Sequence, residues 1–277
     1  MTGVAVSTGS LYDLDVPTED AVDRLAEMGV RAVEVFLQCD PELDERFLAE
    51  LRARCDARGV RVVSVHPYGF GYENLLYSPY RRQRRWAFAR YERYLEACGT
   101  LGATHYVAHG PPRHLAYDGA ALRRGYIEGT ALLAELAGRH GVRYCLENVS
   151  YGLLRTPDEA VAHLAQLGPA VPFVLDFKSA WKCGVAPQAF AAAVGRHIAY
   201  THVSYRGSAT GPFGLTSVAG RPEPDITETM RRLAEAGGMT GPHVVEVFGP
   251  ASLDDVAATF HDVTRHLSAS LQPPYEP

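Results

Sequence analysis

The segment His140-Gly-Val-Arg-Tyr-Cys-Leu-Glu147 contains a junction that recurs along this chain. A glycine ends a helical stretch, a short β-branched and aromatic run follows, and a charged residue closes the run. Glycine suits the left-handed conformation in which many helices end. A short apolar run bounded in this way is typical of a buried parallel strand. The segment therefore predicts a helix that leads into a strand, with Glu147 at the carboxyl end of that strand.

The same pattern repeats over the whole sequence. Eight β-branched runs occupy residues 4–8, 30–36, 60–66, 103–109, 142–147, 171–176, 198–203 and 243–248. Apolar residues at helical spacing follow them at residues 17–28, 41–58, 79–101, 118–140, 157–167, 187–195, 225–237 and 252–268. Parallel strands joined by right-handed helical crossovers close into a (β/α)8 barrel. The sequence therefore predicts an α/β fold with one TIM barrel domain over residues 1–271 and an exposed or partner-wrapped tail over 272–277.

The composition favours a soluble protein that acts on a small molecule. The net charge is -5, whereas nucleic-acid-binding domains carry a basic excess, so we expect no nucleic-acid partner. The five cysteines are widely spaced and form no C-x-x-C pair, which disfavours a disulfide framework and a cysteine zinc site. The first residues are typical of a strand and not of a signal peptide, and no run is long enough to cross a membrane. We expect a cytoplasmic protein, and its homo-oligomerisation stays open.

Each predicted strand carries a polar residue at or near its carboxyl end. These residues are Thr8, Glu34, His66, His109, Glu147, Asp176, His202 and Glu246. Burying an unpaired charge is costly, so a parallel strand has no structural use for a carboxylate. The active site of such a barrel lies at the carboxyl ends of its strands. We therefore expect these side chains to surround one mouth.

The last four of these residues have the chemistry of a metal site. They are Glu147, Asp176, His202 and Glu246. Three carboxylates beside one imidazole suit Mn²⁺, Mg²⁺, Co²⁺ or Zn²⁺. Each residue alone also has a structural explanation, since a carboxylate can cap a helix or form an ion pair. Asp176 could pair with Lys178 or Lys182, and His202 could be a core histidine. Their common register favours one divalent metal ion.

The residues across the mouth admit more than one role. His66 and His109 could be further metal ligands, substrate hydrogen-bond partners or structural residues, and we favour substrate contact. Glu34 lies one strand earlier. We expect it to orient His66 or a backbone group and not to touch substrate.

The strand-end motifs resemble those of the xylose isomerase-like TIM barrels, a superfamily of sugar and sugar-phosphate isomerases and epimerases that also contains AP endonucleases. The similar stretches are Val-Ser-Val-His66, Tyr-Val-Ala-His109-Gly, Cys-Leu-Glu147-Asn148, Val-Leu-Asp176, Thr-His202-Val and Val-Val-Glu246-Val-Phe. The resemblance covers nearly the whole chain. It implies that Glu147, Asp176, His202 and Glu246 hold one divalent metal ion, with Glu147 and Glu246 also serving as acid and base.

Two departures from the superfamily argue against a multinuclear zinc site. Relatives with several zinc ions carry Asp-x-x-His after strand six, whereas this chain reads Asp176-Phe-Lys-Ser179. Such relatives also carry an acidic residue and a histidine after strand seven. Residues 204–214 of this chain contain neither. A three-metal phosphodiesterase site is therefore incomplete here.

We accordingly predict a metal-dependent isomerase or epimerase that acts on a sugar, a sugar phosphate or a related polyhydroxy carbonyl compound. The metal would stabilise an enediolate while Glu147 or Glu246 moves the proton. We expect substrate contacts from His66, His109, Asn148, Lys178 and Arg206. A lyase or dehydratase on the same scaffold is the nearest alternative. An AP endonuclease-like phosphodiesterase and a non-catalytic binding barrel also stay open.

Three segments receive no single role. The run Arg81-Arg-Gln-Arg-Arg85 predicts an exposed helix face or an interface. Residues 207–220 form a glycine-containing loop after strand seven, which suits either a phosphate site or a lid. The aromatic stretch Tyr68-Gly-Phe-Gly-Tyr72 could close over the mouth, contribute to a partner subunit or pack on the surface.

Overall fold

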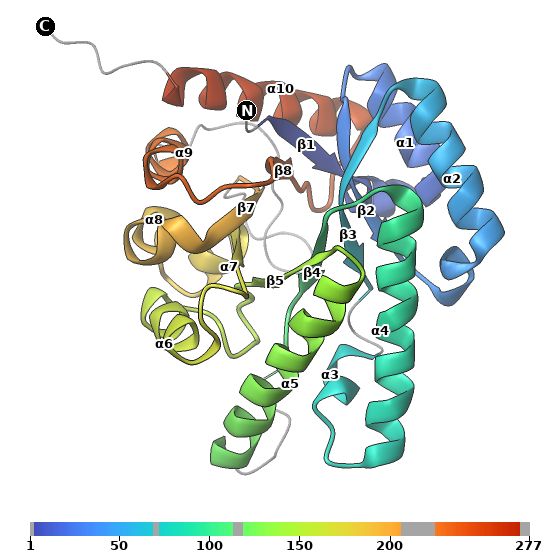
Figure 1. Ribbon diagram of the computed structural model, residues 1–277. Helices are drawn as coiled ribbons and strands as arrows, with labels where there is room; N and C mark the ends of the chain where they lie inside the picture. The colour runs from blue at the N-terminus through green and yellow to red at the C-terminus, as the bar shows by residue number, and fades with distance from the viewer. Residues whose placement is uncertain (1–2, 69–71, 113–118, 206–224, 272–277) are drawn as a thin grey trace, which may run out of the picture.

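The computed structural model describes residues 3–68, 72–112, 119–205 and 225–271. Within these ranges, parallel strands pair in sequence order and the last strand closes onto the first, as Figure 1 shows. The strands are β1 (Val4–Ser7), β2 (Ala32–Leu37), β3 (Arg61–Pro67), β4 (His105–Ala108), β5 (Arg143–Glu147), β6 (Phe173–Asp176), β7 (Ile198–Val203) and β8 (His243–Val245). The predicted (β/α)8 barrel is confirmed.

Helices surround the strands on all sides of the barrel. The longer ones are α1 (Thr18–Glu27), α2 (Glu45–Arg58), α4 (Arg81–Leu101), α5 (Gly119–Arg139), α6 (Pro157–Leu167), α8 (Pro187–Val194), α9 (Asp225–Ala236) and α10 (Leu253–Ser270). In Figure 1, α1, α2 and α4 lie on one side of the strands and α6, α8 and α9 on the other. No helix in the described ranges is long and apolar enough to cross a membrane.

Short helical segments extend several of the connections between strands. They are η1 (Thr8–Leu14), η2 (Asp40–Leu43), α3 (Glu73–Leu76), α7 (Phe177–Lys182) and η4 (Gly195–His197). The sequence patterns did not predict α3 or α7, because helices of four and six residues are too short to show a 3.6-residue period. α7 directly follows β6, and α3 lies between the end of β3 and the start of α4.

The ends of the long helices follow the sequence signals. Gly59 and Gly102 end α2 and α4 with φ angles of 63° and 73°, in the left-handed region that favours glycine. Thr156 begins α6 with a capping box, since its hydroxyl accepts a hydrogen bond from the Glu159 N–H and the Glu159 carboxylate accepts one from the Thr156 N–H. These signals set where each helix returns the chain to a strand.

The interior of the barrel changes from apolar to polar toward the mouth. A buried cluster inside the barrel consists of Ala5, Ala32, Val63, Val107, Cys145, Val174, Ala199, Tyr200 and Val244. Residues two positions apart point to the same face of a strand. Cys145, Val174 and Val244 are therefore followed on the inward face by Glu147, Asp176 and Glu246. This alternation is how the sequence directs three carboxylates to one end of the barrel.

Two strand-end assignments from the sequence are wrong in register. β1 ends at Ser7, and Thr8 begins η1 with its hydroxyl accepting a hydrogen bond from the Phe36 N–H at 2.9 Å. Glu34 lies inside β2, so that Phe36, two residues later on the same face, lines the cavity. Ser7 and Phe36 therefore occupy the positions at the mouth that the sequence pattern assigned to Thr8 and Glu34.

Candidate active site

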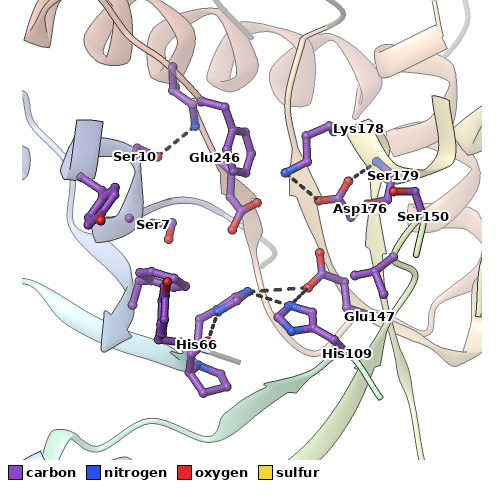
Figure 2. A pocket seen from close by; sticks show the side chains of 18 of the residues that line it. Ser7, Ser10, His66, His109, Glu147, Ser150, Asp176, Lys178, Ser179 and Glu246 are labelled. Atoms are coloured by element: carbon purple, nitrogen blue, oxygen red, sulfur yellow. Dashed lines mark hydrogen bonds and ion pairs between the residues drawn. The ribbon is translucent and has the colours of Figure 1, made fainter. Parts of the chain in front are cut away.

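A cavity of about 320 Å³ opens at the carboxyl ends of the strands. Side chains from most of the strands and from the segments after them line it, and Figure 2 shows many of these from close by. Glu147, Asp176 and Glu246 point toward one another in this view. His66 and His109 approach Glu147 from the other side. The structure thus brings the predicted metal ligands and the two predicted substrate-contacting histidines into one site.

The four predicted metal ligands form a compact group. One ligand atom from each of Glu147, Asp176, His202 and Glu246 lies within 4.8 Å of the other three. Nδ1 of His202 lies 3.1 Å from Oε1 of Glu147 and 3.5 Å from Oε1 of Glu246. All four residues are buried, and His202 lies beneath the cavity with no exposed surface. Such a group is close enough for a single ion to contact all its members.

Glu34 holds His202 from the opposite side of the ring. Its Oε2 lies 3.2 Å from Nε2 of His202 and accepts a hydrogen bond from the Ser64 hydroxyl at 2.7 Å. Burial alone would lower the pKa of His202, but the carboxylates of Glu246, Glu34 and Glu147 hold it well above its usual value. Burial raises the pKa of Glu34, but the interaction with His202 opposes this effect, and the pKa of Glu34 lies below its usual value. The hydrogen-bond partners of the Glu34 carboxylate are His202 and Ser64, while a ring nitrogen of His66 lies within 4.8 Å of that carboxylate.

The charges in this group show that the residues fit a cation. Burial raises the pKa of Asp176 to about 7. The positive charge of Lys178 lowers this pKa, whereas the negative charges of Glu147 and Glu246 raise it further. Three carboxylates held together are thus not all stable as anions without a further positive charge. Oxygen ligands with one imidazole are the donors that Mg²⁺, Mn²⁺, Co²⁺ and Zn²⁺ accept. The donor set and its electrostatics both fit one divalent ion.

His66 and His109 form a hydrogen-bonded pair on the other side of Glu147. Their Nε2 atoms lie 3.3 Å apart, and Nε2 of His109 lies 3.0 Å from Oε2 of Glu147. Nδ1 of His66 donates to the Pro67 carbonyl at 3.0 Å, which leaves Nε2 directed at His109. His66, His109 and Glu147 also have ligand atoms within 4.8 Å of one another. Glu147 therefore joins the histidine pair to the predicted metal ligands.

A buried carboxylate from α3 fixes His109. Oε2 of Glu73 accepts a hydrogen bond from Nδ1 of His109 at 2.9 Å, and Oε1 accepts one from the His109 N–H at 3.3 Å. Burial lowers the pKa of His109, but Tyr151, Glu73 and Glu147 hold it well above its usual value. Burial also raises the pKa of Glu147, whereas His202, His109 and His66 hold it well below its usual range. The site is a continuous network of imidazoles and carboxylates.

The remaining predicted substrate contacts have different outcomes. Lys178 lines the cavity. Asn148 is turned away from it, because its side-chain amide exchanges hydrogen bonds of 2.9 and 2.7 Å with the main chain of Asp176. The sequence suggested a substrate role for Asn148, and the structure instead has it fixing the β5–β6 pair at the metal ligands. Arg206 and the loop 207–220 lie outside the described residues, as do residues 69–71 of the aromatic stretch.

Ser179 stands at the position that corresponds to the histidine in the Asp-x-x-His motif of relatives with several zinc ions. Its backbone N–H donates to Oδ1 of Asp176 at 2.5 Å, and the residue lines the cavity. A hydroxyl in place of an imidazole removes one nitrogen ligand from this wall. The Arg81–Arg85 run lies exposed at the start of α4, and these five residues are absent from the lining of the cavity.

Sequence reasoning missed Glu73 as a site residue and gave Lys182 no contact with the cavity. Glu73 follows no strand directly and begins a helix of four residues, so no pattern marks it. Lys182 lines the cavity because α7 carries it back over the mouth. If a helix is assumed after Asp176, residues four apart share one of its faces, so the spacing of Lys182 from Lys178 predicts that both lysines face the same side.

The sequence matches one family model. A family described as xylose isomerase-like TIM barrel matches residues 22–267, a range that includes every strand-end residue from Glu34 to Glu246. No curated protein matches the sequence. The matched range covers the predicted metal ligands, the histidine pair and α7.

Solved structures match the fold over nearly the full chain. D-psicose 3-epimerase from Clostridium cellulolyticum H10, solved with D-tagatose, is 19% identical with a TM-score of 0.73, over 98% of this chain and 97% of that one. The IOLI protein with a zinc atom is 17% identical with a TM-score of 0.77, over 99% and 100% of the two chains. The probable 3-DHS dehydratase AsbF from Bacillus anthracis is 15% identical with a TM-score of 0.74, over 95% and 98%.

Proposed function

Because this chain belongs to the xylose isomerase-like TIM barrel family, we propose that it is a divalent-metal-dependent isomerase or epimerase of a polyhydroxy carbonyl compound. The substrate would be a sugar, a sugar phosphate or a related molecule. One observation carries this proposal: the ligand atoms of Glu147, Asp176, His202 and Glu246 lie within 4.8 Å of one another beside a cavity of about 320 Å³. That volume is within the range of small-molecule sites.

The four residues supply what the metal half of the reaction requires. Glu147, Asp176, His202 and Glu246 would hold the ion. When bound, a divalent ion supplies Lewis-acid stabilisation of negative charge that develops on the carbonyl and neighbouring hydroxyl oxygens. The similarity to a zinc-containing structure supports this assignment and leaves the identity of the ion to metal analysis.

Glu147 and Glu246 are suited to move the proton. Both line the cavity, on β5 and directly after β8, so they approach a bound substrate from different strands. One of them would take a proton from the carbon beside the carbonyl group. In an isomerisation the same group would deliver that proton to the former carbonyl carbon while a proton passes between the two neighbouring oxygens. In an epimerisation the other group would deliver its own proton to the opposite face of the same carbon.

The remaining side chains would orient the substrate and limit water. His66 and His109 are within reach of Glu147 and are held by Pro67 and Glu73, so their ring positions are fixed before substrate arrives. Phe36, Tyr68 and Phe248 add aromatic walls to the cavity. A fixed network of this kind reduces the reorganisation that proton transfer would otherwise require.

A dehydratase is the second candidate, because AsbF shares the fold over nearly its whole length. It would use the same proton abstraction and then expel water from the neighbouring carbon. The two reactions differ in what happens to the substrate and not in the residues that remove the proton.

Metal analysis combined with an NMR screen in D₂O tests the proposal. The protein, purified without chelators, would be given ketoses, their phosphates and cyclic polyhydroxy acids. The proposal expects about one divalent ion per chain and deuterium in a new isomer or epimer. Loss of water from a substrate would favour the dehydratase, and several zinc ions with nicking of abasic DNA would favour a phosphodiesterase. Absence of metal and of any reaction would contradict an enzymatic role.

A further inference from the structure

Two lysines line one wall of the cavity, and the sequence contains no others. Lys178 and Lys182 both border the cavity. The sequence has 27 lysines and arginines in total, and every other one is an arginine. Lys178 and Lys182 are four residues apart on α7, so they share a face of this helix. Both lysines of this chain therefore lie at the candidate active site.

Lysine and arginine differ in ways that matter in a small cavity. Arginine has a broad planar guanidinium, whereas lysine has a compact ammonium at the end of a flexible stem. Surface ion pairs in the described part of the chain use arginine, as in Arg46–Glu50 and Arg52–Asp56. If positions 178 and 182 served only to place positive charge on the surface, we would expect arginine there as well. Lysine at positions 178 and 182 indicates a demand for a compact positive charge.

Lys178 holds its charge inside the cavity without a hydrogen bond to the nearest carboxylate. Its Nζ lies 3.9 Å from Oδ2 of Asp176, beyond hydrogen-bond distance. The same atom lies 3.0 Å from the centre of the Phe248 ring, which stabilises an ammonium through its π face. The side chain is only 15% exposed. Figure 2 shows Lys178 beside Asp176 at the same opening as Glu246.

Lys182 places a second positive charge on this wall, nearer to solvent. It is exposed and borders the same cavity. Partial burial and the neighbouring charge of Lys178 lower the pKa of Lys182. Two ammonium groups on one wall repel each other, and an anion between or beside them would offset that repulsion.

We infer that Lys178 and Lys182 bind an anionic group of the substrate, which is therefore a polyhydroxy carbonyl compound bearing a carboxylate or a phosphate and not a neutral sugar. This inference rests on the proposed function, because it names the substrate class of the same site. Asp176 lies directly before α7, so the anionic group would sit beside the predicted metal ligands while the reacting carbons face Glu147 and Glu246.

Equilibrium binding of unreactive ligands tests this inference separately from catalysis. Erythritol, erythronate and erythritol 4-phosphate share a four-carbon polyol and differ in charge, and none has a carbonyl group to react. Calorimetry on the metal-loaded protein should show at least one of the two anions binding about tenfold or more tightly than erythritol, as expected of charge-assisted hydrogen bonds. Which anion gains the advantage identifies the carboxylate or the phosphate as the source.

The variants Lys182→Met and Lys178→Met should each remove most of that advantage and leave erythritol binding unchanged. Arg139→Met is the matched control, because Arg139 is an exposed residue at the end of α5 that pairs with Glu135 and does not line the cavity, and its loss changes the net charge equally. Lys182 is exposed, so its variant is expected to fold even where the Lys178 variant does not.

Two results would overturn the inference. The first is equal affinity for all three ligands. The second is an anion preference that survives in the Lys182→Met protein and in a folded Lys178→Met protein, since the anion would then bind through the metal alone. A persistent, lysine-dependent anion preference without any deuterium exchange across the substrate panel would instead refute the proposed reaction and leave the anion site intact.

Discussion

Oε2 of Glu34 lies 3.2 Å from Nε2 of His202, while Nδ1 of the same imidazole faces Glu147 and Glu246. A carboxylate accepts the hydrogen from one ring nitrogen and thereby leaves the other available to a metal ion. Glu34 has no exposed surface and comes from β2, which is separated from β7 by β8 and β1 around the closed barrel. The barrel thus assigns the two nitrogens of His202 to different tasks.

Replacing Glu34 by Gln should weaken metal binding. The amide can present N–H groups to Nε2, so the ring would no longer be held with its hydrogen on that atom. Loss of such an outer partner typically costs about 10–100-fold in metal affinity. Competition with a chromogenic chelator would measure the change. Ser64→Ala removes only the hydroxyl that donates to Glu34, so it should show a smaller loss, and wild-type affinity in both variants would refute the role of Glu34.

Replacing Glu73 by Gln should lower turnover without removing the metal. Both carboxylate oxygens of Glu73 bind His109, one at the ring and one at the backbone. The amide can keep only one of these acceptors, so we expect kcat to fall about tenfold, since general acid–base positioning contributes ~10²–10⁴-fold in total. The pH profile of kcat should shift as well, which a purely structural loss would not cause. Glu159→Gln, in the α6 capping box, is the charge-matched control and should keep wild-type kcat.

Removal of the metal should destabilise the protein. A chelator would leave Glu147, Asp176 and Glu246 together without a cation. A ligand present at a hundredfold excess over its Kd stabilises the native state by about 2.7 kcal/mol, and a domain of this size gains ~2–4 °C in Tm per kcal/mol. We therefore expect EDTA to lower the Tm by about 5–10 °C. In Asp176→Asn the Tm should respond much less, and an equal response would contradict Asp176 as a ligand.

Mild acid should destabilise the fold through a histidine far from the mouth. His243 begins β8, is buried, and has its Nδ1 2.8 Å from the Thr201 hydroxyl. Burial lowers the pKa of His243 from 6.5 to about 4. The unfolded chain therefore binds a proton below pH 6.5 that the native state takes up only below pH 4. Stability should fall by about 3 kcal/mol as the pH drops through that window.

The variant His243→Gln tests this linkage. Urea unfolding at pH 7, 5.5 and 4.5 should give a shallower loss of unfolding free energy in the variant than in wild type. His140→Gln, at an exposed position, should keep the wild-type slope. A parallel loss of stability in the variant and in wild type would contradict this role of His243.

The barrel and the metal ligands were predictable because both depend on local pattern. Buried parallel strands are apolar, so a carboxylate at the end of such a run stands out, as Glu147 and Asp176 do. Glycines such as Gly59 and Gly102 mark where the helices stop. Eight similar strand–helix units predict a closed barrel in which every strand has two neighbours, and the structure confirms this arrangement.

The rest of the site depends on tertiary contacts that no local pattern records. Glu73 reaches His109 from a four-residue helix, and Glu34 reaches His202 across the barrel. Asn148 stands beside Glu147 in sequence but faces the main chain of Asp176, because successive strand residues point in opposite directions. Lys182 enters the cavity only through the turn of α7. Spacing along the sequence predicts the face of a strand or helix on which a side chain lies, but it does not predict the residue that the side chain contacts.

Solvent deuterium incorporation by wild type and Glu246→Gln, at matched metal content, tests the central claim most directly. With a substrate found in the D₂O screen, wild type should place deuterium on the carbon beside the carbonyl group and lose this activity when treated with chelator. The variant should be slower by about 10²–10⁴-fold, as expected for loss of a general acid–base group. Deuterium incorporation by Glu246→Gln at the wild-type rate, or by wild type at an unchanged rate without metal, would contradict the proposed mechanism.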